Sequence, residues 1–158
     1  MSLPCPCRSG LMYSACCEPL HLGVQEADSA EALMRSRYSA FAQAKAQYLV
    51  DTWAEERRPA LEELTADLKA QVERGERWVA LKVLSAQGAA GDEEGAVAFE
   101  ASLISGAQLI TLTEVSRFIR AEGAWRYLEG NPQINTRKLG RNERCPCGSG
   151  QKVKRCCA

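Results

Sequence analysis

The spacing of apolar residues changes once along this chain, from a helical period to a period of two. Between residues 28 and 75, apolar side chains recur three or four positions apart, as at Leu33, Met34, Tyr38 and Phe41. This spacing predicts helices. The first is expected to begin after Ser29, a second to hold Tyr48 to Trp53, and a third to run from about Ala60 to Glu73 and end before Gly75.

From Arg77 onward apolar and polar residues alternate, which predicts strands. The expected strands begin at Arg77, cover residues 97–103 and about 108–120, and begin again at Trp125. Tight turns are expected at Ser105-Gly106 and Glu122-Gly123. Helices followed by a four-strand antiparallel sheet indicate an α+β fold.

All eight cysteines lie in two copies of one pattern, C-x-C-x8-C-C, at the two ends of the chain. The first copy is Cys5, Cys7, Cys16 and Cys17, and the second is Cys145, Cys147, Cys156 and Cys157. An internal repeat that uses every thiol indicates that each copy is one chemical unit.

Three chemistries compete for these thiols. Disulfides are disfavoured because the chain shows no export signal, which predicts a reducing cytoplasmic location. Redox or nucleophilic catalysis is disfavoured because the C-x-x-C spacing is absent, although Lys154 and Arg155 precede Cys156. Four thiolates suit a closed tetrahedral metal site, with zinc as the expected ion and iron as the alternative, one ion per copy.

Charge is unevenly distributed, although the formal net charge is 0. From Arg137 to the end there are seven basic residues and one acid, Glu143, so this segment carries +6 and the remainder −6. Lys152, Lys154 and Arg155 are the candidate contacts to an acidic partner, and they also offset the charge of a thiolate site. Specific nucleic-acid binding is not expected, because this segment has no aromatic residue for stacking on bases. No apolar run is long enough to span a membrane.

The C-terminal run from Cys145 to Cys157 resembles the SEC-C motif, a small zinc-binding module also found at the C-terminus of the SecA preprotein translocase motor. The N-terminal copy departs from that pattern at Arg8, where glycine is usual, so its turn is expected to differ. The resemblance implies a metal-binding adaptor whose partner is a protein or ribonucleoprotein, linked to protein export or the ribosome. We call the two cysteine copies, residues 5–17 and 145–157, the N-terminal and C-terminal knuckles. Because Leu11, Met12 and Tyr13 are apolar, we expect the N-terminal knuckle to pack on the region between the copies and the basic C-terminal knuckle to remain in solvent.

The middle of the chain resembles the YchJ family of bacterial proteins. The residues that carry this resemblance are the run from Leu33 to Phe41, Tyr48-Leu49, Thr52-Trp53, Arg77-Trp78 and Ser116-Arg117-Phe118. It implies a nuclear-transport-factor-2-like (cystatin-like) central domain with a curved sheet, in a family whose biochemical function is unassigned. The expected units are residues 1–24, 25–133 and 134–158, the outer two being a metal knuckle with its linker.

The implied fold often has a pocket between sheet and helices, and some of its members are enzymes. The candidates to line such a pocket here are Arg35, Tyr38, Trp53, Glu114 and Arg117. Pairing of Arg35 or Arg37 with a buried carboxylate is favoured over acid–base chemistry, because that geometry satisfies both groups. The chain lacks the common hydrolase and phosphate-binding motifs. A zinc-binding interaction protein is therefore the leading hypothesis, and a small-molecule binder or enzyme is the alternative. His21, the only histidine, is expected on the surface.

Overall fold

A computed structural model describes residues 3–157 of the chain. The helices are α1 (Glu18–His21), α2 (Ala30–Ala42), α3 (Ala46–Asp51) and α4 (Leu61–Glu73), with single 3₁₀ turns at Tyr13–Ala15, Glu55–Arg57 and Val153–Arg155. The strands are β1 (Arg77–Gln87), β2 (Glu94–Ser105), β3 (Gln108–Ala121), β4 (Ala124–Gly130) and β5 (Gln133–Lys138). The α+β order of helices followed by an antiparallel sheet is confirmed.

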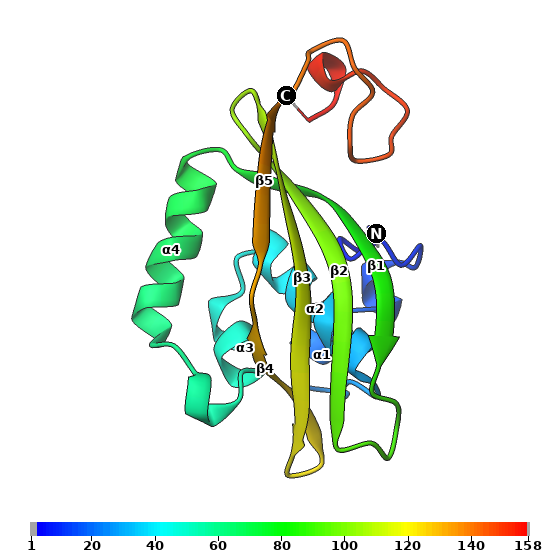
Figure 1. The fold of residues 1–158 in the computed structure, drawn as a ribbon, viewed down its shortest axis with the longest axis vertical. Helices are drawn as coiled ribbons and strands as arrows, with labels where there is room; N and C mark the ends of the chain where they lie inside the picture. The colour runs from blue at the N-terminus through cyan, green and yellow to red at the C-terminus, as the bar shows by residue number, and fades with distance from the viewer. Residues whose placement is uncertain (1–2, 158) are drawn as a thin grey trace.

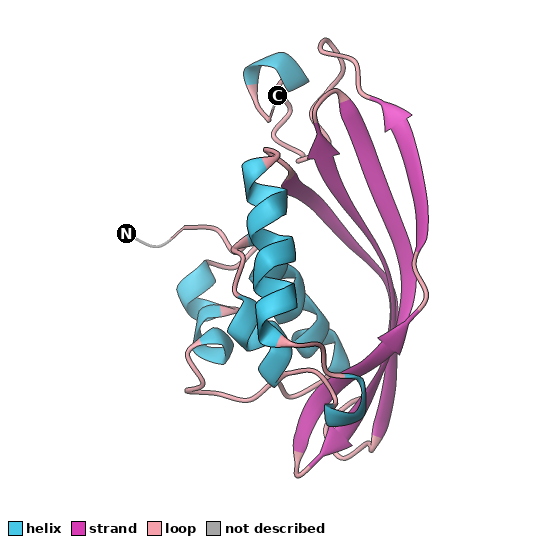
Figure 2. Cartoon of the chain, turned by 90° about the vertical axis from the view of Figure 1, so that its left-hand side faces the viewer, coloured by secondary structure: helices cyan, strands magenta, loops and turns pink. Residues whose placement is uncertain are grey.

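The sheet curves around the helices, which gather on its concave face (Figures 1 and 2). Strands β1 to β4 form an antiparallel meander in sequence order. The expected turns close it: Gly106 follows β2 with a positive φ, and Glu122 and Gly123 join β3 to β4 with φ of 51° and 80°. Two consecutive positive φ values match the twist of a tight hairpin.

A fifth strand extends the sheet beyond the four that were predicted. β5 pairs with the first half of β3, from Gln108↔Lys138 to Thr113↔Gln133, whereas β4 pairs with its second half. β4 and β5 therefore share one edge of β3 and are separated by a break at residues 131–132. The sheet reaches Lys138, into the segment that was predicted as a basic linker. The expected unit boundaries after residues 24 and 133 otherwise stay predictions.

Helix α2 forms the centre of the domain. It begins as predicted, since the Ser29 hydroxyl accepts a hydrogen bond from the backbone N–H of Ala32 at 3.1 Å. One side of α2 packs with Leu33 and Met34 against Val97, Phe118 and Trp125 of the sheet. Its C-terminal end joins α3 and α4 in a second apolar cluster that includes Ala40, Leu49, Val50, Leu64 and Leu68. No helix within residues 3–157 is long and apolar enough to cross a membrane.

Candidate metal centres and central pocket

Each cysteine copy folds into a cluster of four sulfur atoms. Within each set the Sγ atoms all lie within 4.8 Å of one another, and none of the eight thiols forms a disulfide. Cys7 Sγ lies 3.5 Å from Cys16 Sγ, and Cys147 Sγ lies 3.3 Å from Cys156 Sγ. The adjacent pairs are 3.9 Å apart at Cys16–Cys17 and 3.7 Å apart at Cys156–Cys157.

These separations fit a tetrahedral thiolate site. Zinc–sulfur bonds of about 2.3 Å place the corners of a regular tetrahedron about 3.8 Å apart. The four measured edges scatter around that value and are far longer than a disulfide bond. All ligands in each set are sulfur, which favours a soft or borderline metal over magnesium or calcium. The residues present therefore fit one structural metal ion per knuckle.

The two knuckles share one backbone frame, offset by 140 residues. Cys5 N–H donates to Leu11 O at 2.9 Å, and Cys145 N–H donates to Gln151 O at 2.8 Å. A 3₁₀ turn follows in both, and it ends on Cys16 (φ −132°, ψ −96°) or Cys156 (φ −131°, ψ −91°). This turn delivers the last two cysteines of each copy to the sulfur cluster. The internal repeat of the sequence is thus a repeat of structure.

The turn at Arg8 does not differ from that at Gly148, contrary to the sequence-based expectation. Arg8 adopts a φ of 64° and Gly148 one of 83°. A non-glycine residue in this left-handed region costs about 1–2 kcal/mol. The Arg8 guanidinium offsets that cost with two hydrogen bonds, from Nη1 to Cys147 O at 3.0 Å and from Nη2 to Val79 O at 2.6 Å.

The pKa values of the crowded thiols differ from one another, because each thiolate disfavours the ionisation of its neighbours. Contact with Cys17 and Cys7 lowers the pKa of Cys5, whereas contact with Cys5 and Cys7 raises the pKa of Cys17. In the second set burial opposes ionisation of Cys147, but hydrogen bonds led by that of Ser149 lower its pKa to about 6. Four thiolates this close repel one another, so a divalent cation favours their joint ionisation.

Serine hydroxyls support the sulfurs from outside each cluster. Ser9 Oγ lies 3.2 Å from Cys16 Sγ, and the equivalent Ser149 Oγ lies 3.2 Å from Cys156 Sγ. The N-terminal set gains a further contact, because Ser39 Oγ of α2 donates to Cys17 Sγ at 3.3 Å. Such outer contacts orient metal ligands and tune their charge.

The N-terminal knuckle packs on the central domain as predicted, but it does so through its cysteines and Tyr13, whereas Leu11 and Met12 are exposed. Cys5, Cys7 and Cys17 are buried in one cluster with Tyr38 of α2 and Ala101 of β2. This centre is therefore continuous with the core of the body, and its sulfurs are shielded from solvent on that side.

The C-terminal knuckle is not free in solvent, which corrects the expectation from its basic sequence. Val153, only 1% exposed, and Cys145 pack against Val79, Ile104 and Leu109 at one end of the sheet. The sequence signal was Val153 itself, an apolar residue between two lysines. Figure 1 shows the knuckle at the end of the sheet where β5 leaves it.

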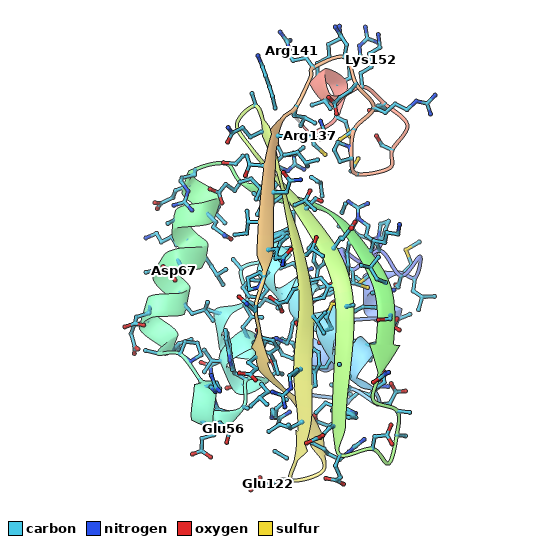
Figure 3. The ribbon with its side chains drawn as sticks, in the orientation of Figure 1. Glu56, Asp67, Glu122, Arg137, Arg141 and Lys152 are labelled. Carbon is cyan, nitrogen blue, oxygen red and sulfur yellow. The ribbon has the colours of Figure 1, made fainter. Side chains whose placement is uncertain are left out.

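The candidate partner contacts face outward from this knuckle. Lys152, Lys154 and Arg155 are exposed, and none of them forms an ion pair with any carboxylate in residues 3–157. Glu143 is engaged by Arg137 at 2.9 Å. Figure 3 shows Arg137, Arg141 and Lys152 near this end of the molecule, with Glu56 and Glu122 near the opposite end.

Three of the five predicted pocket residues line a cavity of about 380 Å³ between α2 and the sheet. These are Tyr38, Trp53 and Glu114. Arg35 lies elsewhere, because it pairs with Glu31 and donates to Cys7 O at 2.9 Å, which supports the N-terminal knuckle. Arg117 is also wrong as a pocket residue: it lies exposed beside Glu129. Glu114 and Arg117 are an odd number of residues apart on β3, so they point to opposite faces of the sheet.

The cation that does line the cavity is Arg37, which is 5% exposed. Its guanidinium lies between two aromatic rings, 4.7 Å from the centroid of Trp53 and 4.6 Å from that of Tyr127. Nη1 donates to Leu49 O at 2.8 Å and to Thr52 Oγ1 at 2.7 Å. The sequence favoured pairing of Arg35 or Arg37 with a buried carboxylate, but among the described residues Arg37 pairs with none, and Arg35 pairs with Glu31, which is not buried. The signal for the burial of Arg37 was its spacing, three and four residues from Met34, Leu33 and Phe41.

His21 is not a surface residue, in contrast to the sequence-based expectation. It ends α1 half-buried, with Nε2 donating to Ser36 O at 2.8 Å and Nδ1 accepting from the Tyr13 hydroxyl at 2.6 Å. Burial lowers the pKa of His21. The neutral imidazole therefore joins the N-terminal knuckle to α2.

Known proteins share both the knuckles and the central domain. Residues 29–130 match the middle NTF2-like domain of YchJ, and residues 1–19 and 141–158 match the SEC-C motif. The protein YchJ of Shigella dysenteriae, of the UPF0225 group, is 42% identical over 158 residues, which is 99% of either chain.

Two solved structures of SEC-C motif containing proteins are similar in fold. The solution structure from Rhodopseudomonas palustris is 34% identical with a TM-score of 0.69, and the match covers 83% of this chain and 98% of that one. The crystal structure from Psychrobacter arcticus is 29% identical with a TM-score of 0.67, over 97% and 94% of the two chains. The match extends over both cysteine knuckles and the domain between them, and this chain belongs to the bacterial YchJ (UPF0225) family of SEC-C motif proteins.

Proposed function

We propose that this protein is a cytoplasmic interaction protein in which two structural zinc ions hold the knuckles, and the C-terminal knuckle presents a basic surface to an acidic partner. The observation that carries the proposal is the set of exposed, unpaired cations on a knuckle whose other side is fixed to the sheet. Zinc is proposed because four thiolates with tetrahedral spacing suit it best, with iron as the alternative ion.

The charge of this surface exceeds what a metal centre needs. Residues 137–158 carry seven basic residues and one acid, which gives +6. Four thiolates around a divalent ion contribute about −2, which leaves about +4 on the knuckle and its approach. Surface charge of one sign attracts acidic partners and accelerates their association. The N-terminal knuckle lacks this feature, since its loop residues Leu11 and Met12 are apolar.

The partner class that we propose is an acidic protein or a ribonucleoprotein recognised through charge. A ribonucleoprotein would be recognised through its phosphates, because the basic segment has no aromatic side chain for stacking on bases. The resemblance of the knuckle to the SecA module directs the search to the protein-export machinery and the ribosome.

A salt-dependent pull-down tests this proposal. The full zinc-loaded chain is compared with the triple variant Lys152→Gln, Lys154→Gln, Arg155→Gln, and with Cys145→Ser. The matched control replaces three other exposed cations that form no ion pair in residues 3–157, Lys45, Lys69 and Lys82, by Gln.

We expect purified ribosomes or translocase components to bind the wild type and the control variant, with affinity that falls as salt rises. The triple variant and Cys145→Ser should lose this binding. Equal binding by all four proteins would refute the proposed role of the C-terminal knuckle.

A further inference from the structure

The central cavity is a separate feature from the basic knuckle and has the dimensions of a ligand site. Its volume of about 380 Å³ lies within the range of small-molecule pockets, which begin near 300 Å³. Most of the lining is apolar or aromatic, from α2 and from all the strands of the sheet. The residues that set this character include Phe41, Trp78, Phe99, Leu103, Leu112 and Phe118.

Polar groups of opposite charge also line this cavity. Arg37 contributes a buried guanidinium held between two rings, and both of its hydrogen bonds are donated by Nη1. Nε and Nη2 thus have no hydrogen-bond partner within residues 3–157. Burial lowers the pKa of Arg37 to about 10, which leaves the side chain cationic at neutral pH.

Glu114 supplies the carboxylate. It lines the same cavity and accepts a hydrogen bond from the buried hydroxyl of Ser116. The Glu114 carboxyl group can occupy this position because residue 130 is glycine, since a Cβ built on Gly130 would meet that group. Arg37 and Glu114 do not form an ion pair with each other among the salt bridges of the described chain. The two charges therefore face one cavity without neutralising each other by contact.

We propose that this cavity binds a small uncharged molecule with an apolar body and a planar head group that carries an acceptor beside a donor, as a carboxamide or lactam does. The acceptor would receive a hydrogen bond from Arg37, and the donor would give one to Glu114. A carboxylate head would be attracted by Arg37 but repelled by Glu114. An ammonium head would be attracted by Glu114 but repelled by Arg37. The apolar body would occupy the aromatic walls.

Three probes with one apolar body and different heads test this assignment: phenylbutyramide, phenylbutyrate and phenylbutylamine. Each is titrated into the zinc-loaded full chain labelled with nitrogen-15, and the indole signals of Trp53 and Trp78, which line the cavity, are followed. We expect the amide to shift both signals and to bind about tenfold more tightly than the acid or the amine. The proposal is overturned if no probe shifts these signals, or if a charged probe binds more tightly than the amide.

A charge swap inside the pocket provides the second test. Glu114→Gln keeps the shape of the side chain and its partner Ser116 but removes the negative charge, so the preference should invert towards phenylbutyrate. Glu100→Gln on β2 is the matched control, because it removes the same charge from the opposite face of the sheet and should leave the preference unchanged. An unchanged preference in Glu114→Gln would overturn the head-group assignment.

A filled cavity locates the binding site independently. Leu112→Trp on β3 adds bulk at a half-buried lining position. A folded variant, judged from dispersed amide signals, should bind none of the three probes. If it binds the amide as the wild type does, the cavity is not the site.

Discussion

Arg8 of the N-terminal knuckle donates a hydrogen bond to the backbone carbonyl of Cys147 in the C-terminal knuckle, with Nη1 and O 3.0 Å apart. The same guanidinium binds Val79 O on β1 at 2.6 Å. One side chain therefore joins the two cysteine knuckles and the edge of the sheet, although Arg8 and Cys147 are 139 residues apart. The position that departs from the usual glycine of the motif is the one that makes this connection.

Two substitutions at Arg8 separate the bonds from the backbone strain. Arg8→Ala loses both charge-assisted hydrogen bonds and keeps a left-handed non-glycine residue, so we expect a loss of about 1–2 kcal/mol in the free energy of unfolding. Arg8→Gly loses the same bonds but relieves about 1 kcal/mol of strain, so it should be the more stable of the two. Denaturant unfolding of the zinc-loaded chains measures both values. Wild-type stability in Arg8→Ala would show that the bonds contribute nothing.

Removal of one ligand should affect the two knuckles unequally. Cys17 is buried with Tyr38 and Ala101 in the core, whereas Cys157 is only half-buried. Elemental analysis should find about two zinc ions per wild-type chain and about one in either Cys17→Ser or Cys157→Ser. Because the N-terminal centre is continuous with the body, Cys17→Ser should lower the melting temperature of the sheet further than Cys157→Ser does.

Circular dichroism and tryptophan fluorescence follow that melting. Equal shifts in the two variants would contradict the unequal packing of the knuckles. Unchanged metal content in either variant would instead contradict its assignment as a ligand.

The cysteine knuckles and the main elements could be predicted because their signals are local. The thiol spacing defines each knuckle within 13 residues, and Ser29 and Gly75 mark helix ends directly in the sequence. β5 was missed because its six residues are all exposed, with Ile134 as the only aliphatic residue. A polar edge strand carries little hydrophobic alternation, so only its pairing with β3 reveals it.

The pocket was predicted only in part, because the sequence did not show which arginine of α2 faces it. Arg35 and Arg37 differ by two positions on α2, which separates them by about 200° around the helix. Only Arg37 falls on the stripe of Leu33 and Phe41 that faces the body. The link from Arg8 to Cys147 could not be predicted at all, because no local pattern reports a contact between the two ends of the chain.

The pH dependence of stability should contain a contribution from His21. Burial places the folded-state pKa of His21 below its ordinary value of 6.5. The contribution is therefore fully present above about pH 6.5, and it is lost as pH falls towards the folded-state pKa, because the unfolded chain then binds a proton that the folded chain does not. Thiolate protonation acts in the same range, so the measurement is the difference between wild type and His21→Gln from pH 5 to 8. A difference that does not change with pH would contradict this account.

The contact between Gly130 and Glu114 makes a prediction that only a double-mutant cycle can test. A Cβ on Gly130 would meet the Glu114 carboxyl group, while the φ of Gly130 is not positive. Gly130→Ala should therefore destabilise the protein by about 1–3 kcal/mol through overpacking and not through backbone strain. In a Glu114→Ala background the added methyl meets no carboxyl group, so the same substitution should be nearly neutral. Urea unfolding of the four proteins gives the coupling energy, which is large only if the two residues compete for one space. A similar cost of Gly130→Ala in both backgrounds would mean that another group occupies that space, and that Glu114 reaches the cavity without the help of the glycine.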